Sequence, residues 1–263
     1  MLAHAFRTVR DGLLGLTYPE KCRVCGDAVE SWDDGVACAR CWDDPTVTRL
    51  FDDNLCRKCG IPVSGPESDF PASLTSEPGR VCGLCSELPF TAARACGRYS
   101  GALEASILFL KSNPHLSPRL RALLFGTFVG NRNTLESEIV VPVPLHSARR
   151  KQRGFNQADI VAALISRKFN LRLDKHSLVR AKPTERHRAG MDATDRAKSV
   201  ERAFKVATPR LVAGASVLLV DDVMTTGSTI SAATVALIEA GAGNVNVLTI
   251  ARVGQRAQIS GLR

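Results

Sequence analysis

Aromatic residues are scarce in this chain of 263 residues, because Phe, Trp and Tyr together make up 5% of it. Surfaces on which nucleic-acid bases could stack are therefore few. Long apolar runs are missing too, since segments such as Val217–Val220 are far shorter than the ~20 residues of a membrane-spanning helix. The N-terminal stretch Leu13–Leu16 is flanked by acidic residues and lacks a small-residue cleavage site. We therefore expect a cytoplasmic protein with no membrane span and no secretory signal.

Acidic residues are the minority, and the net charge of +9 is unevenly distributed. Residues 1–95 contain 10 Lys and Arg against 14 Asp and Glu, a net charge of −4, whereas residues 96–263 contain 25 against 12, a net charge of +13. Residues 146–210 alone contain 17 basic and 6 acidic side chains. Such a basic segment favours a polyanionic partner, either a phosphate-rich ligand or nucleic acid, although the solvated surface of a basic protein gives the same composition.

Eight of the nine cysteines form four pairs with the spacing Cys-x-x-Cys. Two residues between thiolates allow both sulfurs to bind one tetrahedral ion at about 2.3 Å. Disulfides are not expected in a cytoplasmic chain, and a redox pair is expected beside a βαβ unit rather than in a series of four. We therefore predict structural zinc, up to two ions, at these residues. The predicted ligands are Cys22, Cys25, Cys38, Cys41, Cys56, Cys59, Cys82 and Cys85.

The gaps between these pairs fit two zinc-ribbon sites. Twelve residues separate the first pair from the second, and 22 residues separate the third pair from the fourth. Joining the first pair with the second and the third with the fourth is the simplest arrangement, and a cross-braced one remains open. With four protein ligands each, both ions would be structural. Residues 20–90 contain few large apolar side chains, so metal binding would supply the folding free energy of this segment.

From Ala93 onward, apolar strand patterns alternate with amphipathic helices. This alternation predicts parallel βαβ units in an open, mostly parallel α/β sheet, whose ligands bind at the carboxyl ends of the strands. We divide the chain into an N-terminal helix with a double zinc-ribbon module (residues 1–92) and a sheet domain (residues 93–263). The predicted strands are residues 138–143, 216–220 and 244–250, and the predicted helices are residues 156–169 and 229–240.

An acidic pair, Asp221 and Asp222, follows one predicted strand, and a loop of hydroxyl residues and one glycine follows the pair. The two carboxylates can accept hydrogen bonds from the 2′- and 3′-hydroxyls of a ribose. The loop offers backbone N–H groups, hydroxyls and the positive end of the next helix to a phosphate. No Gly-Lys-Ser/Thr follows, so it is not a Walker A loop. We predict a ribose 5-phosphate site made by Asp221, Asp222, Thr225, Thr226, Gly227, Ser228 and Thr229.

The segment Val217–Thr229 resembles the phosphoribosyl pyrophosphate (PRPP) motif of type I phosphoribosyltransferases. The segments Val141–His146 and Arg153–Gln157, together with the cysteine pairs, resemble the ComF branch of that superfamily (competence protein F, ComFC/GntX-like). The resemblance covers nearly the whole chain. It implies the type I phosphoribosyltransferase fold, preceded by a double zinc ribbon.

The resemblance also implies how the site works. Phosphoribosyl transfer depends on positioning the ligand and on stabilising the leaving pyrophosphate. Magnesium is implied as well, held mainly by the oxygens of PRPP. Arg153 and Lys111 are our candidates for stabilising the leaving group. Arg149, Arg150 and Lys151 are candidates for contacting pyrophosphate or nucleic acid, and a solvated basic loop is the alternative for them.

Three functions are compatible with these residues. The ComF resemblance implies a role in natural competence, in which the protein handles incoming single-stranded DNA with a helicase partner. An active phosphoribosyltransferase with an unknown acceptor is the second function, and a PRPP sensor without turnover is the third. The sequence offers no convincing general base, since His146 is placed to orient its loop as well as to act on an acceptor.

Overall fold

The structure of the protein is a computed structural model, and it describes residues 20–45, 55–61, 81–82, 85–180 and 203–253. The N-terminal helix expected within residues 1–92 precedes these ranges and lies outside the described residues. Among the described residues, no helix combines the length and the apolar character that a bilayer crossing requires.

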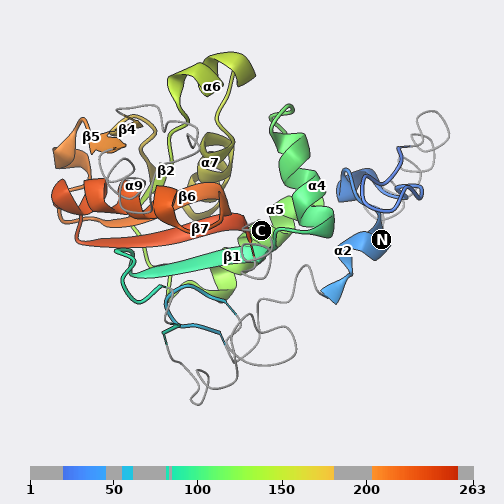
Figure 1. Ribbon diagram of the computed structural model, residues 1–263, viewed down its shortest axis with the longest axis horizontal. Coiled ribbons are helices and arrows are strands. Elements are labelled where there is room, and N and C mark those ends of the chain that lie inside the picture. The colour runs from blue at the N-terminus through green and yellow to red at the C-terminus, as the bar shows by residue number, and fades with distance from the viewer. Residues whose placement is uncertain (1–19, 46–54, 62–80, 83–84, 181–202, 254–263) are drawn as a thin grey trace, which may run out of the picture.

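Five parallel strands form the central sheet, as the alternation of strands and helices predicts (Figure 1). Three of them are long or fully buried apolar segments, and their buried side chains occupy both faces of the sheet. The strands lie in the order β1 (Ala92–Arg98), β7 (Asn244–Arg252), β6 (Ser216–Met224), β2 (Ile139–Pro142) and β3 (Arg172–Leu173).

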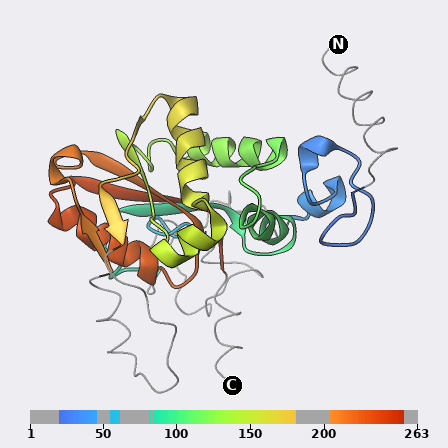
Figure 2. The ribbon, with the colours of Figure 1, turned by 90° about the horizontal axis from the view of Figure 1, so that it is seen from above.

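Helices cover both faces of this sheet, and Figure 2 shows α7 and α9 on opposite sides of it. One face packs against α4 (Gly101–Leu110), α5 (Pro118–Gly130) and α7 (Gln157–Phe169). The other face packs against α9 (Ser228–Glu239) and the hairpin of β4 (Leu178–Arg180) and β5 (Phe204–Val206). The shorter helical segments are η1 (Trp32–Asp34), α2 (Ala39–Trp42), α6 (Ser147–Arg153) and η3 (Pro209–Leu211).

Local sequence signals place α7 correctly, whereas β6 extends beyond its predicted end. The Asn156 side chain caps α7 by accepting a hydrogen bond from the Ala158 N–H at 3.3 Å, as expected for an N-cap residue. We expected the strand of residues 216–220 to end before the acidic pair, but β6 continues to Met224. It continues because β7 pairs with it up to Met224 and Arg252, a partner that the local sequence of β6 does not reveal.

The two halves of the cysteine-rich segment pack on different faces of the sheet. Cys22 and Cys38 belong to the core that contains α4 and α5, together with Trp42. Cys56 and Cys59 belong to the core that contains α9. The division of the chain near residue 92 stays a prediction, because β1 begins at that residue and both cysteine groups share a core with the sheet.

Ion pairs help to fix the first cysteine group against α5. Arg119 on α5 pairs with Asp34 at 2.9 Å and also with Asp43. The Arg119 guanidinium lies 5.7 Å from the centre of the Trp42 ring. Acidic side chains of the N-terminal segment therefore meet a basic side chain of the body at this contact.

Candidate functional site

The strand β6, a three-residue loop and α9 present the predicted phosphate-binding residues as one continuous unit. We call residues 225–229 the phosphate loop. Thr225 and Thr226 are exposed, and α9 begins at Ser228. The Thr226 hydroxyl oxygen accepts a hydrogen bond from the Ser228 N–H at 3.3 Å and lies 3.1 Å from the Ser228 hydroxyl. The first backbone N–H groups of a helix lack intrahelical partners, so this end of α9 can bind an anion.

Gly227 is required by the backbone of this loop. Its φ of 84° lies in the left-handed region, which glycine adopts without a steric penalty. A Cβ at this position would lie 3.0 Å from Met224 Cε and 3.3 Å from Leu88 Cδ1. The loop therefore passes directly over two side chains, and one of them comes from the cysteine-rich segment.

The acidic pair is electrostatically strained. Burial raises the pKa of the Asp221 carboxyl well above its ordinary value, and the neighbouring Asp222 carboxylate raises it further. The Asp222 N–H donates to Asp221 Oδ1 at 2.9 Å and partly offsets this effect. Burial also raises the pKa of the Tyr99 hydroxyl at the end of β1, with smaller contributions from the charges of Glu104 and Asp222. A ligand that donates hydrogen bonds or carries positive charge would stabilise the ionised pair.

We predict that Asp221→Asn stabilises the free protein at neutral pH by roughly 1 to 3 kcal/mol, the cost of a poorly compensated buried polar group. The folded state of the native chain binds the Asp221 proton more tightly than the unfolded state does. Its stability therefore falls as the pH rises from the ordinary carboxyl pKa through the raised one. The Asn variant lacks this fall, which thermal unfolding between pH 4 and pH 8 measures.

The matched control is Asp174→Asn, because Asp174 Oδ1 accepts hydrogen bonds from the His176 and Ser177 N–H groups at 2.9 Å each. This second variant should lose stability at neutral pH. Equal destabilisation by both substitutions would contradict the account of Asp221.

The basic residues of the turn after β2 lie on α6. The His146 side chain caps this helix, because its Nδ1 accepts a hydrogen bond from the Ala148 N–H at 3.2 Å. Arg149, Arg150 and Lys151 are exposed, and Arg150 lies 3.6 Å from Asp159. Arg153 is half-buried at the last position of α6.

Lys111 lies at the C-cap of α4, ten residues along a helix that starts at the end of β1. At 1.5 Å per residue this is about 15 Å from the helix start. Among the described residues, its side chain makes no hydrogen bond or ion pair with the acidic pair or the phosphate loop. The roles of Lys111 and Arg153 in the site stay predictions.

Sequence reasoning did not single out Arg180, the last residue of β4. Its guanidinium lies 5.1 Å from the centre of the Phe204 ring on the paired strand β5. Burial lowers the pKa of Arg180, Arg149 lowers it further, and Asp221 raises it. The charges of Arg149 on α6 and of Asp221 therefore both act on the Arg180 guanidinium. The available signal was only a basic residue at the end of a short apolar strand, which many surface strands share.

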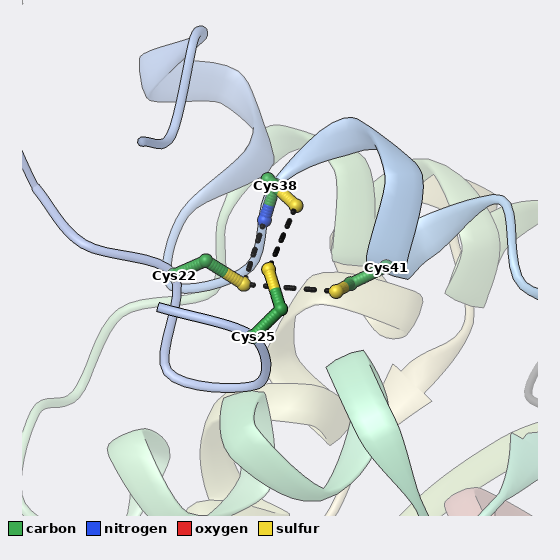
Figure 3. Close-up of side chains that lie close together, drawn as sticks. All are labelled: Cys22, Cys25, Cys38 and Cys41. Carbon is green, nitrogen blue, oxygen red and sulfur yellow. Dashed lines mark hydrogen bonds between the residues drawn. The ribbon is translucent and has the colours of Figure 1, made fainter. Parts of the chain in front are cut away.

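The cysteines form two sets of four, and the predicted sequential arrangement is confirmed. Figure 3 shows the first cysteine set, Cys22, Cys25, Cys38 and Cys41, with its sulfurs turned toward one another. Cys22 Sγ lies 3.8 Å from Cys41 Sγ, and Cys25 Sγ lies 3.6 Å from Cys38 Sγ. Sulfurs at about 2.3 Å from a tetrahedral zinc ion are about 3.8 Å apart, so this set fits the ion.

The second cysteine set comprises Cys56, Cys59, Cys82 and Cys85, and all four residues are buried. Cys56 Sγ lies 3.5 Å from Cys85 Sγ, and Cys59 Sγ lies 3.4 Å from Cys82 Sγ. The N–H groups of Cys59 and Cys82 donate to Cys56 Sγ at 3.4 and 3.2 Å. All nine cysteines are free of disulfide bonds. Four convergent sulfurs with N–H donors fit a structural zinc ion, which would complete the fold of this segment.

Two family models match this chain, one in the cysteine-rich segment and one in the sheet domain. Residues 153–259 match the phosphoribosyl transferase domain, and residues 13–86 match the double zinc ribbon domain. The DNA utilization protein YhgH of Escherichia coli (strain K12) is 29% identical over 246 residues, which cover 90% of this chain and 99% of its own. Competence protein F of Haemophilus influenzae is 35% identical over 116 residues, which cover 44% of this chain and 50% of its own.

One further curated protein and one solved structure align with part of the chain. Competence protein ComFC of Bacillus subtilis is 31% identical over 118 residues, covering 43% of this chain and 44% of its own. A solved structure of the glutamine PRPP amidotransferase from Bacillus subtilis aligns with a TM-score of 0.37 and 19% identity, covering 55% of this chain and 30% of its own.

The parallel sheet and the phosphate loop define a phosphoribosyltransferase-type domain, joined to a double zinc ribbon with two sets of four cysteines. Both domains and the relatives named competence protein F and ComFC confirm the resemblance to the ComF family that the sequence motifs indicate.

Proposed function

We propose that the protein binds the ribose 5-phosphate portion of PRPP at the phosphate loop and acts in the use of incoming DNA. The observation that carries the proposal is the unit of an acidic pair, a left-handed glycine and a helix N-terminus at the carboxyl end of the central strand β6. The names of the relatives, which concern DNA utilization and competence, support the second half of the proposal.

The residues divide the ligand among them. Asp221 and Asp222 accept hydrogen bonds from the ribose hydroxyls, and the N–H groups at the start of α9 bind the 5-phosphate. Arg180 and the basic residues of α6 face the pyrophosphate. Magnesium, bound mainly through the pyrophosphate oxygens and water, would neutralise part of the ligand charge. Turnover with an acceptor is an alternative to regulated binding, and release of pyrophosphate distinguishes the two.

Titration calorimetry of the zinc-loaded protein with PRPP and magnesium tests this site. We expect binding in the micromolar range and a loss of roughly 10- to 100-fold in affinity for Asp222→Ala, since a hydrogen bond to a charged group contributes about 1.5 to 3 kcal/mol. Glu138→Ala is the control, because this exposed residue precedes β2 at the opposite end of the sheet. Absence of PRPP binding by the native chain would rule the proposal out.

The exposed cations of α6 support single-stranded DNA as a second ligand, with a competence helicase as the partner that the proposed role requires. Arg149, Arg150 and Lys151 are consecutive and exposed, and few aromatic residues accompany them. Contacts with DNA would therefore involve mainly phosphates and depend strongly on salt. Replacing all three by alanine should reduce the slope of log affinity against log salt by about two units, at ~0.7 per lost contact. An unchanged slope would exclude α6 as the DNA contact.

A further inference from the structure

One buried arginine, Arg252, lies between the second cysteine set and the end of β6, from which the phosphate loop starts. Arg252 is the last residue of β7 and pairs in register with Met224, the last residue of β6. Its Nη1 donates to the carbonyl oxygen of Cys59 at 2.8 Å and lies 3.7 Å from Met224 Sδ. The Val253 N–H donates to the Met224 carbonyl at 3.0 Å and fixes the same point.

Two side chains, Met224 and Leu88, connect this region with the phosphate loop. Met224 is buried, and its Cε lies 3.0 Å from the place that a Cβ at Gly227 would take. Leu88 Cδ1 lies 3.3 Å from the same place, and the Leu88 N–H donates to the Cys85 carbonyl at 3.2 Å. Met224 and Leu88 therefore support the backbone of the phosphate loop at Gly227. Leu88 is bound to Cys85 of the second cysteine set, and Met224 contacts Arg252.

The charge of Arg252 needs compensation that the protein side chains around it do not supply. The residue is 8% exposed, and its Nε has no hydrogen-bond partner. Among the described residues, no carboxylate forms an ion pair with it; its partners are a carbonyl and a thioether. A buried cation without a counter-charge is costly. Four thiolates with one zinc ion carry a net charge of −2, which would compensate the guanidinium beside Cys59.

We propose that Arg252 couples zinc binding at the second cysteine set to the conformation of the phosphate loop, so that ligand affinity depends on this zinc ion and not on the first. The inference rests on the proposed function of the loop. Arg252 acts as a positioning residue, because it contacts Met224, the side chain that supports the loop at Gly227. The first cysteine set provides the internal comparison, since its described contacts reach α4 and α5, through Arg23 on Phe109 and Arg119 on Asp34.

The coupling is reciprocal, because two ligands that affect one another's affinity do so by the same factor. The test uses the full chain with Cys25→Ser and Cys41→Ser, which leaves zinc only at the second set. Competition with a chelator measures the zinc affinity with and without saturating PRPP and magnesium. We expect PRPP to tighten zinc binding by about 5- to 150-fold. The same measurement on the chain with Arg252→Met should show no effect of PRPP, and Arg252→Lys should restore part of it.

Hydrogen exchange of residues 225–229 provides a readout that needs no ligand. Removal of the second zinc ion should accelerate exchange in this loop in the native chain, whereas the Arg252→Met loop should exchange fast in both states. If the chain binds PRPP but PRPP leaves the zinc affinity unchanged, the coupling is wrong and the proposed function still stands. If the native chain does not bind PRPP, the proposed function fails, and the exchange experiment still decides whether Arg252 links the zinc ion to the loop.

Discussion

Cys56→Ser combined with Cys85→Ser is expected to unfold the second zinc-ribbon segment and to cut the yield of soluble chain severely, while the α/β sheet stays at least partly folded. All four residues of the second cysteine set are buried, and they share one core with α9 and the sheet. Structural zinc sites contribute about 10 to 16 kcal/mol of apparent binding free energy, which equals or exceeds the ~5 to 15 kcal/mol by which whole domains are stable. Soluble yield, zinc content and far-ultraviolet circular dichroism of the purified chain measure the loss.

The first cysteine set supplies the matched control. Cys25 is exposed, and the set packs against α4 and α5 at the periphery of the body. Cys25→Ser with Cys41→Ser should remove one of two zinc ions per chain and leave the cooperative unfolding of the sheet in place. Figure 1 shows the segment that contains α2 beside α4, at the edge of the body away from β6 and α9. Equal damage from the two double substitutions would contradict the different roles assigned to the sets.

Gly227→Val is expected to lower the free energy of unfolding by roughly 2 to 4 kcal/mol and to remove PRPP binding. A β-branched residue at a φ of 84° is strained by about 1 to 3 kcal/mol. The contacts of a Cβ with Met224 Cε at 3.0 Å and Leu88 Cδ1 at 3.3 Å add an overpacking cost of similar size. The loop would have to shift to relieve the backbone strain and the close contacts, and this shift would move its N–H groups away from the ligand. Chemical denaturation and calorimetry give the two quantities.

The control variant Gly214→Val introduces the same kind of backbone strain without changing the phosphate loop. Gly214 has a φ of 71°, a Cβ there would meet no atom within 4 Å, and the residue precedes β6 at the other end of the strand. This variant should lose stability through the backbone term alone and retain its affinity for PRPP. If Gly227→Val binds PRPP as tightly as Gly214→Val does, the loop is not the phosphate site.

The candidate site was predictable from sequence wherever its parts are adjacent in the chain. The cysteine spacing limits which thiols can share an ion, and the strand, acidic pair, glycine loop and helix follow one another within 13 residues. Capping residues such as Asn156 and His146 act on N–H groups two residues away, so their roles were also accessible. The pairing of the cysteine pairs into sets was left open by spacing alone, and the structure decides it.

The sequence by itself therefore determined the α/β class, the zinc-ligand residues and the order of strand, acidic pair, loop and helix, because short-range spacing and hydrophobic period carry that information. Only the tertiary structure decided that β6 runs on to Met224, that Arg180 packs on Phe204, and that Arg252 contacts Cys59 across 193 residues of chain. The physical reason is that these contacts depend on strand register and on the packing of separate elements into one core. No local pattern encodes which distant side chain will fill a given position in that core.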